Sequence, residues 1–211
     1  MEILYYALLA VVAYLLGSIP SAVWVGKKFY HVDVRKHGSG NAGTTNVLRV
    51  LGAKAALPVF AIDIAKGLAA VLLVYVVPNS QQHPETIGTL KIAYGLLSIM
   101  GHMYPVFAAF RGGKGVATML GIIIAIQPEA ALIALSVFIV VFAATRYVSL
   151  GSMLGGLSFP ISVVVVLHEK MLSVQIFSVF ACLLLFYTHR KNIQRLLKGV
   201  EPKTTFKKKH V

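Results

Sequence analysis

The chain has 211 residues, of which 57% are hydrophobic and 13% charged, and its 20 Lys and Arg against 7 Asp and Glu give a formal net charge of +13. In a soluble domain about a quarter of the residues are charged, and a nucleic-acid-binding domain would spread its basic residues over most of its surface. Here the charges are sparse and bunched, and the mean hydropathy is +0.78. The composition therefore excludes disorder and nucleic-acid binding and predicts an integral membrane protein. The single cysteine, Cys182, excludes disulfides and zinc clusters.

Seven apolar stretches approach or reach the roughly 20 residues that a membrane-spanning helix needs. They are continuously apolar and lack the alternation of a membrane strand, so we expect an all-α protein with seven transmembrane helices. The fourth stretch is short, and it either spans with help from its neighbours or is re-entrant. The stretches are 3–26, 55–77, 87–107, 115–127, 129–145, 148–167 and 171–188.

Lys and Arg are distributed unevenly over the connections between these stretches, which predicts the orientation of the chain. The N-terminus and the second, fourth and sixth connections hold only Lys170, and Lys66 and Lys91 lie inside stretches. We therefore expect an outside N-terminus and a single membrane domain, 1–211, that ends in a cytoplasmic tail from about residue 189. The other basic residues lie on the predicted cytoplasmic side: Lys27, Lys28, Arg35, Lys36, Arg49, Lys54, Arg111, Lys114, Arg146, Arg190, Lys191, Arg195, Lys198, Lys203, Lys207, Lys208 and Lys209.

The first connection, HVDVRKHGSGNAGTTNVLRVLG, is longer and more polar than a link between helices requires. Its GSGNAG stretch matches the dinucleotide pattern GxGxxG, but that fold needs a βαβ unit and membrane helices flank this one. Glycines permit backbone N–H groups to converge on an anion, and Arg49 offers a planar fork to phosphate. The alternative is a flexible surface loop with a topogenic arginine. The candidate binding residues are Gly38, Ser39, Gly40, Asn41, Gly43, Thr44, Thr45 and Asn46.

The third connection, GHMYPVFAAFRGGKGVAT, places three glycines and Lys114 where a helix begins. A helix N-terminus attracts anions through its N–H groups and its dipole, so Gly112, Gly113 and Gly115 are candidate phosphate-binding residues together with Lys114. The stretch is not a Walker A loop, because Ala108 replaces the first glycine and Gly115 replaces the Ser or Thr, and ATP hydrolysis is not supported. The alternative is a turn with a topogenic lysine.

The C-terminal tail begins YTHRKNIQRLLKGVEPK, directly after the last apolar stretch. His189 and Asn192, three residues apart, share one helical face. Neighbouring cations disfavour protonation of the imidazole, which keeps it neutral as an acceptor or base. Ser149 lies on the same predicted side of the membrane and is a further candidate. The alternative for His189 is an ordinary residue at the membrane boundary.

Two ionisable residues, Asp63 and Lys66, lie one turn apart inside the second stretch, where they need to pair or to face a polar interior. We interpret them as a structural pair, with support of the site as the alternative. We interpret His102 and Pro105 as residues that kink and pack the end of a helix.

Three polar motifs far apart in sequence converge on the predicted cytoplasmic side, and each suits phosphate. We therefore expect a phosphate-bearing ligand taken from the cytoplasm at the membrane surface, with a lipid part held between helices. Most cytoplasmic cations are interpreted as topogenic, whereas Arg49 and Lys114, beside glycines and small polar residues, are assigned to chemistry. The sequence has no evident cluster of His, Cys and carboxylates, so we expect neither a metal nor a cofactor.

The chain resembles the PlsY family, the bacterial acyl-phosphate:glycerol-3-phosphate acyltransferases, in the stretches GSIPSA, DVRKHGSGNAGTTNVLR, DIAKG, GHMYPVFAAFRGGKGVAT and HRKNIQRLLKGVE. The resemblance implies transfer of a fatty acyl group from acyl phosphate to the sn-1 hydroxyl of glycerol 3-phosphate. The products would be lysophosphatidic acid and phosphate, formed on the cytoplasmic face of the bacterial inner membrane. No histidine has Asp five residues later, so the His-x4-Asp pair of other acyltransferases is absent. The oligomeric state stays open, with a monomer among the alternatives.

The resemblance also assigns roles by position. Arg49 and Ser39 would hold the acyl-phosphate leaving group, the loop around Lys114 would hold glycerol 3-phosphate, and His189 would orient the acceptor with Asn192. The base is either His189 or a phosphate oxygen of a substrate. A transporter or flippase is the runner-up, but it predicts a mid-membrane site and repeat symmetry, and no repeat is evident. The family's substrate-binding positions fall on Thr45, Asn46, Gly112, Gly113, Gly115 and, at a final acidic position, Glu201.

Overall fold

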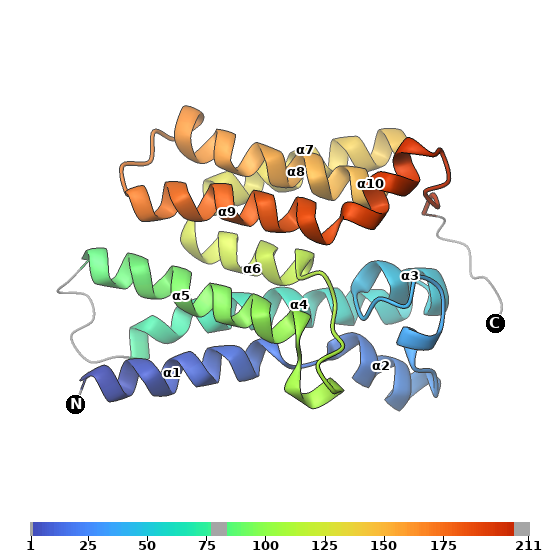
Figure 1. The fold of residues 1–211 in the computed structure, drawn as a ribbon, viewed down its shortest axis with the longest axis horizontal. Helices are drawn as coiled ribbons and strands as arrows, with labels where there is room; N and C mark the ends of the chain where they lie inside the picture. Colours follow the sequence, from blue (N-terminus) through green and yellow to red (C-terminus); the bar gives the residue numbers. More distant parts are fainter. Residues whose placement is uncertain (1, 77–83, 205–211) are drawn as a thin grey trace. The chain divides into compact units, whose positions relative to one another are not determined.

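The computed structural model describes residues 2–76 and 84–204, and every regular element in these two ranges is helical (Figure 1). The chain forms two compact units, the first extending to Ile126 and the second beginning at Gln127. The predicted all-α class is confirmed. The end of the predicted tail, 205–211, lies outside the described ranges.

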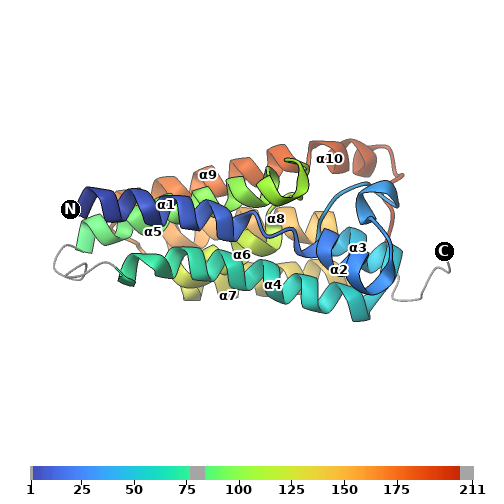
Figure 2. The ribbon, with the colours of Figure 1, turned by 90° about the horizontal axis from the view of Figure 1, so that it is seen from below.

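The first unit is built around three long helices, α1, α4 and α5, and the shorter α6. In this unit α1 packs against α5 and α4, and α4 packs along α6, while α2 and α3 contact α4 (Figures 1 and 2). Its elements, in which η marks a short 3-10 helix, are α1 (Glu2–Gly17), α2 (Ser21–Tyr30), η1 (Val34–Lys36), α3 (Thr44–Leu51), α4 (Ala53–Leu72), η2 (Leu73–Val76), α5 (Pro84–Met103), η4 (Val106–Ala108) and α6 (Val116–Ile126).

Glycines allow the helices of the first unit to touch through their backbones. A Cβ added to Gly121 of α6 would lie 2.0 Å from the carbonyl oxygen of Ile64 in α4. A Cβ on Gly17 of α1 would likewise lie 2.0 Å from the carbonyl oxygen of Ser98 in α5. Small residues at helix contacts are typical of membrane proteins, because apolar burial gives helices no advantage over lipid.

The first predicted stretch, 3–26, is two helices rather than one. α1 ends at Gly17, α2 begins at Ser21, and the two are bent by 43°. Pro20 lies in the break and has no backbone N–H with which to continue α1. The break brings the hydroxyl of Ser21 to Asp63 of α4, and Ser21 Oγ donates a hydrogen bond to Asp63 Oδ1 (2.7 Å).

The second unit contains α7 packed against α8, and α9 packed against α8. A Cβ on Gly155 of α8 would lie 2.7 Å from the carbonyl oxygen of Ala134 in α7, so a small residue again sets the helix contact. Large apolar side chains face outward, with Val140 67% and Leu183 63% exposed. The elements are α7 (Pro128–Thr145), α8 (Val148–Ile161), the π-helical η5 (Ser162–Val166), α9 (Leu172–Thr188) and α10 (Arg190–Leu197).

Among the described residues, three helical segments are long and apolar enough to cross a membrane, Ala53–Val76, Pro128–Thr145 and Val148–Val166. The number rises to five if each bent pair, α1 with α2 and α9 with α10, forms one span. The chain is thus an all-helical integral membrane protein, and seven spans remain a prediction. The short fourth stretch is α6, an apolar helix of 11 residues.

Candidate active site

The side chain of Asn46 organises the first glycine loop, which we define as residues 38–43. Asn46 Oδ1 accepts a hydrogen bond from the backbone N–H of Ser39 (2.8 Å), and Nδ2 donates to the carbonyl oxygens of Val34 (2.8 Å) and His37 (3.1 Å). Asn46 is only 1% exposed and its amide holds the backbone on either side of the loop, while the substrate contact expected from the sequence stays a prediction. Gly38 has a φ of +61°, and a Cβ there would lie 2.4 Å from Asn46 Oδ1, so this position requires glycine.

The other members of the first glycine loop lie closer to solvent. Ser39 and Gly40 are exposed, as is Gly38, and Asn41 is partly buried. The side-chain oxygen of Asn41 lies beside Gly43, where an added Cβ would be 2.9 Å from Asn41 Oδ1. The loop thus presents the Ser39 side chain outward while Asn46 holds its backbone from inside.

α3 begins directly after this loop and carries the expected Thr45 and Arg49. Its N-cap residue is Gly43, which has no side chain with which to cap the first N–H groups. Thr44 Oγ1 is buried and has no hydrogen-bond partner within the described parts of the chain. Thr45 and Arg49 lie four residues apart on one face of α3, and both are partly buried. An uncapped helix start with an unsatisfied hydroxyl and a nearby guanidinium can receive phosphate oxygens.

The second glycine loop, residues 112–115, folds back on the end of α5. The backbone N–H of Gly112 donates to the carbonyl oxygen of Met103 (3.2 Å), and that of Gly113 donates to the carbonyl oxygen of His102 (3.1 Å). These two N–H groups therefore hold the turn, and phosphate binding by Gly112 and Gly113 stays a prediction. A Cβ on Gly112 would lie 1.9 Å from the His102 carbonyl oxygen, which explains the need for glycine.

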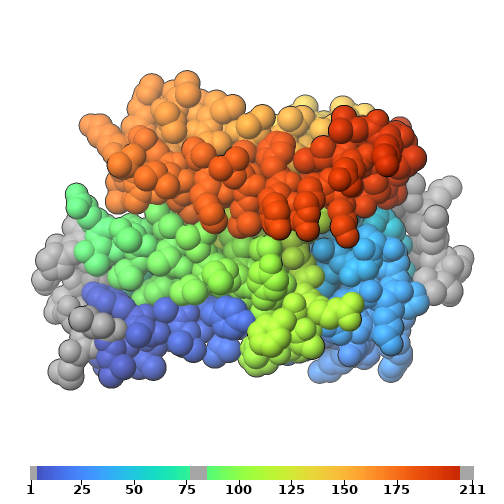
Figure 3. All heavy atoms as spheres, in the orientation of Figure 1, coloured from blue at the N-terminus to red at the C-terminus, as the bar shows by residue number. Residues whose placement is uncertain are grey.

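The two glycine loops lie next to each other in the first unit. A Cβ on Gly113 would be 2.2 Å from His102 Nε2 and 2.9 Å from the carbonyl oxygen of Ala42, which belongs to the first glycine loop. The space-filling view shows the yellow-green α5–α6 connection at the surface beside the blue segments that follow α1 (Figure 3). Lys114 is partly buried and Gly115, with a φ of +79°, turns the chain into α6. The structure therefore brings together the first two of the three predicted motifs.

A buried polar network lies beneath these loops. Lys66 Nζ is 2.8 Å from Asp63 Oδ1, with side-chain exposures of 3% and 1%, which confirms the predicted structural pair. His102 Nδ1 lies 3.7 Å from the same carboxylate oxygen and 3.2 Å from Thr118 Oγ1 of α6. His102, at 6% exposed, is packed at the end of α5 as expected, and its imidazole lies against Gly113.

In the second unit, the carboxylate of Glu201 gathers three side chains. Glu201 Oε1 accepts hydrogen bonds from Ser149 Oγ (2.7 Å) and Asn192 Nδ2 (2.6 Å), and Oε2 accepts one from Arg195 Nε (2.6 Å). The Glu201 side chain is 4% exposed. Ser149 and Asn192 thus share one acceptor oxygen of Glu201, and a substrate contact of Ser149 or Glu201 stays a prediction.

His189 lies at the junction of α9 and α10, where the two helices are bent by 59°. It is 3% exposed, and its Nδ1 lies 2.8 Å from the carbonyl oxygen of Leu185. A carbonyl can only accept, so Nδ1 carries the hydrogen, and in the neutral imidazole Nε2 is the acceptor. The contact with the Leu185 carbonyl therefore favours the tautomer in which Nδ1 carries the hydrogen.

The sequence-predicted residues thus form two sets, one within each unit. The residue that sequence reasoning missed in the second set is Arg195. It lies three residues after Asn192 on α10, and Glu201 is an isolated acid in a basic tail, so the pairing had a signal in the sequence. Within 2–76 and 84–204, no group of three or more His, Cys, Asp or Glu could hold a metal ion.

The fold and these sets define an all-helical membrane protein with cationic, glycine-rich loops. Residues 7–199 match the family model described as glycerol-3-phosphate acyltransferase. A glycerol-3-phosphate acyltransferase of Clostridioides difficile is 44% identical over 212 residues, covering 99% of this chain and 100% of that protein. One of a Thermoanaerobacter species is 43% identical over 201 residues, covering 95% and 96% of the two chains.

Solved structures also show similarity to glycerol-3-phosphate acyltransferases. The crystal structure of PlsY, an integral membrane glycerol 3-phosphate acyltransferase, in its glycerol 3-phosphate form has a TM-score of 0.82 and 38% identity, covering 95% of this chain and 96% of that one. Its lysophosphatidic acid form has a TM-score of 0.80. The chain belongs to the PlsY-type glycerol-3-phosphate acyltransferase family, and it is an integral membrane acyltransferase that produces lysophosphatidic acid.

Proposed function

We propose that the enzyme takes its acyl group from acyl phosphate and transfers it to the sn-1 hydroxyl of glycerol 3-phosphate, in the first acylation of phospholipid synthesis. The observation that carries this proposal is the contact between the two glycine loops at Ala42 and Gly113. Arg49 follows the first glycine loop, and Lys114 lies within the second. The proposed reaction brings together two phosphate-bearing substrates. Two adjacent phosphate sites match that requirement.

The chemistry needs no covalent enzyme intermediate, because acyl phosphate is an activated mixed anhydride. The sn-1 oxygen attacks the acyl carbonyl carbon, and the bond from that carbon to the phosphate oxygen breaks. Phosphate leaves with the bonding electron pair, and a base takes the hydroxyl proton. The protein then contributes alignment of the two substrates and neutralisation of the charge on the leaving phosphate.

In this proposal Arg49 and Ser39 hold the acyl-phosphate leaving group, and Lys114 holds the phosphate of glycerol 3-phosphate. The unsatisfied hydroxyl of Thr44 supports a phosphate oxygen near the start of α3. His189 and Asn192 act on the acceptor hydroxyl, and Asn192 is held in place by Glu201.

The proposal places the enzyme in the bacterial cytoplasmic membrane as one domain of seven spans, with the N-terminus outside. The tail from residue 189 and the active site then face the cytoplasm. The distribution of Lys and Arg supports this orientation, since basic residues flank membrane helices on the cytoplasmic side. In the parts of the chain that the structure describes, three to five segments meet the length and composition of a span, which is compatible with a multi-pass protein.

Replacing His189 with Gln tests which group is the base. If the imidazole is the base, we expect a large fall in kcat, because Gln cannot accept the proton at neutral pH. The measurement is kcat and its pH dependence for phosphate release. Near-normal turnover with an unshifted pH profile would instead assign the proton to a phosphate oxygen of a substrate.

Phosphate release by the purified, detergent-solubilised protein tests the reaction itself. With acyl phosphate present, we expect release that depends on glycerol 3-phosphate and falls at least about tenfold in Ser39→Ala, Arg49→Ala and Lys114→Ala. Lys54→Ala, which removes an exposed cation at the start of α4, is the matched control and should keep wild-type activity. No release from the wild type, or equal release from all variants, would exclude the proposed reaction.

A further inference from the structure

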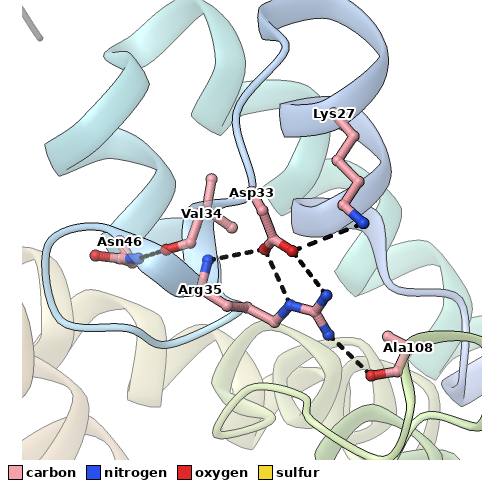
Figure 4. Close-up of polar contacts among 6 residues, drawn as sticks. All are labelled: Lys27, Asp33, Val34, Arg35, Asn46 and Ala108. Carbon is pink, nitrogen blue, oxygen red and sulfur yellow. Dashed lines mark hydrogen bonds and ion pairs between the residues drawn. The ribbon is translucent and has the colours of Figure 1, made fainter.

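Arg35 is one of the cations that the sequence assigns to topology, yet its guanidinium is held in place by three hydrogen bonds to two residues (Figure 4). Arg35 Nε donates to Asp33 Oδ1 (3.0 Å) and Nη2 donates to Asp33 Oδ2 (2.8 Å), which is a bidentate pair. The two side chains are 18% and 14% exposed. Lys27 Nζ approaches the same carboxylate from the outside at 3.7 Å. A merely topogenic arginine does not need this degree of enclosure.

The third contact of Arg35 crosses to a distant segment of the first unit. Nη1 donates to the carbonyl oxygen of Ala108 (2.9 Å), at the end of η4. The next two residues, Ala109 and Phe110, have φ of 54° and 57°. Such left-handed conformations are unfavourable for non-glycine residues, so the turn needs support from neighbouring residues. It leads within two residues to Gly112, where the second glycine loop begins.

The short helix η1 also contacts the first glycine loop. The carbonyl oxygen of Val34, the neighbour of Arg35, accepts a hydrogen bond from Asn46 Nδ2, and Asn46 Oδ1 accepts from the N–H of Ser39. Asp33 caps η1, because its Oδ1 accepts the backbone N–H of Arg35 (3.1 Å). One three-residue helix is therefore linked to both glycine loops, to the first through Val34 and Asn46 and to the second through Arg35 and the turn that follows Ala108.

We propose that Arg35, held by Asp33, is a positioning residue. Through its hydrogen bond to the carbonyl of Ala108 it fixes the position of the two glycine loops relative to each other. The proposal rests on the proposed function, in which each loop holds one phosphate-bearing substrate. The guanidinium side-chain hydrogen bond holds the pKa of Asp33 well below its usual range, so the carboxylate stays ionised at neutral pH. Lys cannot replace Arg here, because one ammonium cannot bond a carboxylate bidentately and reach a carbonyl beyond it.

The kinetic test compares Arg35→Lys and Asp33→Asn with Lys36→Ala, an exposed neighbour in η1. In Arg35→Lys and Asp33→Asn the two loops are no longer held in the right relative position, so kcat for phosphate release should fall about tenfold. KM for glycerol 3-phosphate should stay within about threefold of the wild-type value, because each loop still binds its own substrate. Lys36→Ala should match the wild type. A wild-type kcat in Arg35→Lys overturns the proposal, and so does a raised KM with unchanged kcat, which indicates direct substrate contact.

Amide hydrogen exchange provides a readout that does not depend on activity. In Arg35→Lys we expect faster exchange at Gly112 and Gly113, whose N–H groups hold the second glycine loop, with unchanged exchange in α4 and α5. Unchanged exchange at these two amides overturns the proposal whatever the kinetics show. If the wild type releases no phosphate from acyl phosphate, the proposed function fails, and the exchange comparison still decides whether Arg35 positions the loop.

Discussion

Replacing Lys66 with Met is expected to lower the free energy of unfolding by about 3–5 kcal/mol, because it leaves Asp63 as a buried carboxylate without its ammonium partner. The two groups are 2.8 Å apart and almost completely buried. The substitution also removes the hydrogen bond from Lys66 Nζ to the carbonyl oxygen of Ile19 (2.9 Å), which lies in the break between α1 and α2. Thermal unfolding of the purified protein in detergent measures the loss.

The matched control is the double variant in which Lys66→Met is combined with Asp63→Leu. Exchanging a buried ion pair for apolar residues of similar volume is often neutral, so we expect the double variant to recover most of the lost stability. The recovery should be incomplete, because Ser21 loses its acceptor. If the free energy of unfolding of Lys66→Met alone lies within about 1 kcal/mol of the wild-type value, the pair does not stabilise the fold.

The parts of the structure that the sequence predicts well depend on local spacing or on composition. Continuous apolar stretches predict helices, and Asp63 and Lys66, three residues apart inside one, predict a pair whatever the rest of the fold does. Pro20 is a local signal for the break in the first stretch. The apolar run around it is long enough for a single span, however, so the sequence predicted one helix there.

The parts that the sequence could not predict depend on a distant partner. Glycines and small polar residues indicate a phosphate-binding chemistry, but they do not show which atoms already have partners inside the protein. The N–H groups of Gly112 and Gly113 bond carbonyls of α5, and the amide of Asn46 bonds the backbone of Val34 and Ser39. Arg35 contacts Ala108, 73 residues away, and Glu201 contacts Ser149, 52 residues away. Pairings of this kind follow from how the helices pack.

Replacing Glu201 with Gln is expected to lower the free energy of unfolding of the second unit by about 2–3 kcal/mol near neutral pH. The carboxylate accepts hydrogen bonds from Ser149, Asn192 and Arg195. Gln keeps one acceptor oxygen, and its NH2 group then faces another donor, so at least one buried partner is left unsatisfied. Glu129→Gln, which changes an exposed glutamate of α7, is the control and should leave stability within about 0.5 kcal/mol of the wild type.

The same cluster predicts how stability depends on pH. Burial alone would raise the pKa of Glu201, but the hydrogen bonds from Asn192, Ser149 and Arg195 outweigh it and lower the pKa below its ordinary value. The unfolded chain then takes up the proton more readily than the folded one, so the carboxylate stabilises the fold fully above the ordinary Glu pKa of about 4.3. This stabilisation is lost as the pH falls through the lowered folded-state pKa. We therefore expect the Tm of the wild type to fall more steeply than that of Glu201→Gln below about pH 4, and parallel curves would contradict the assignment.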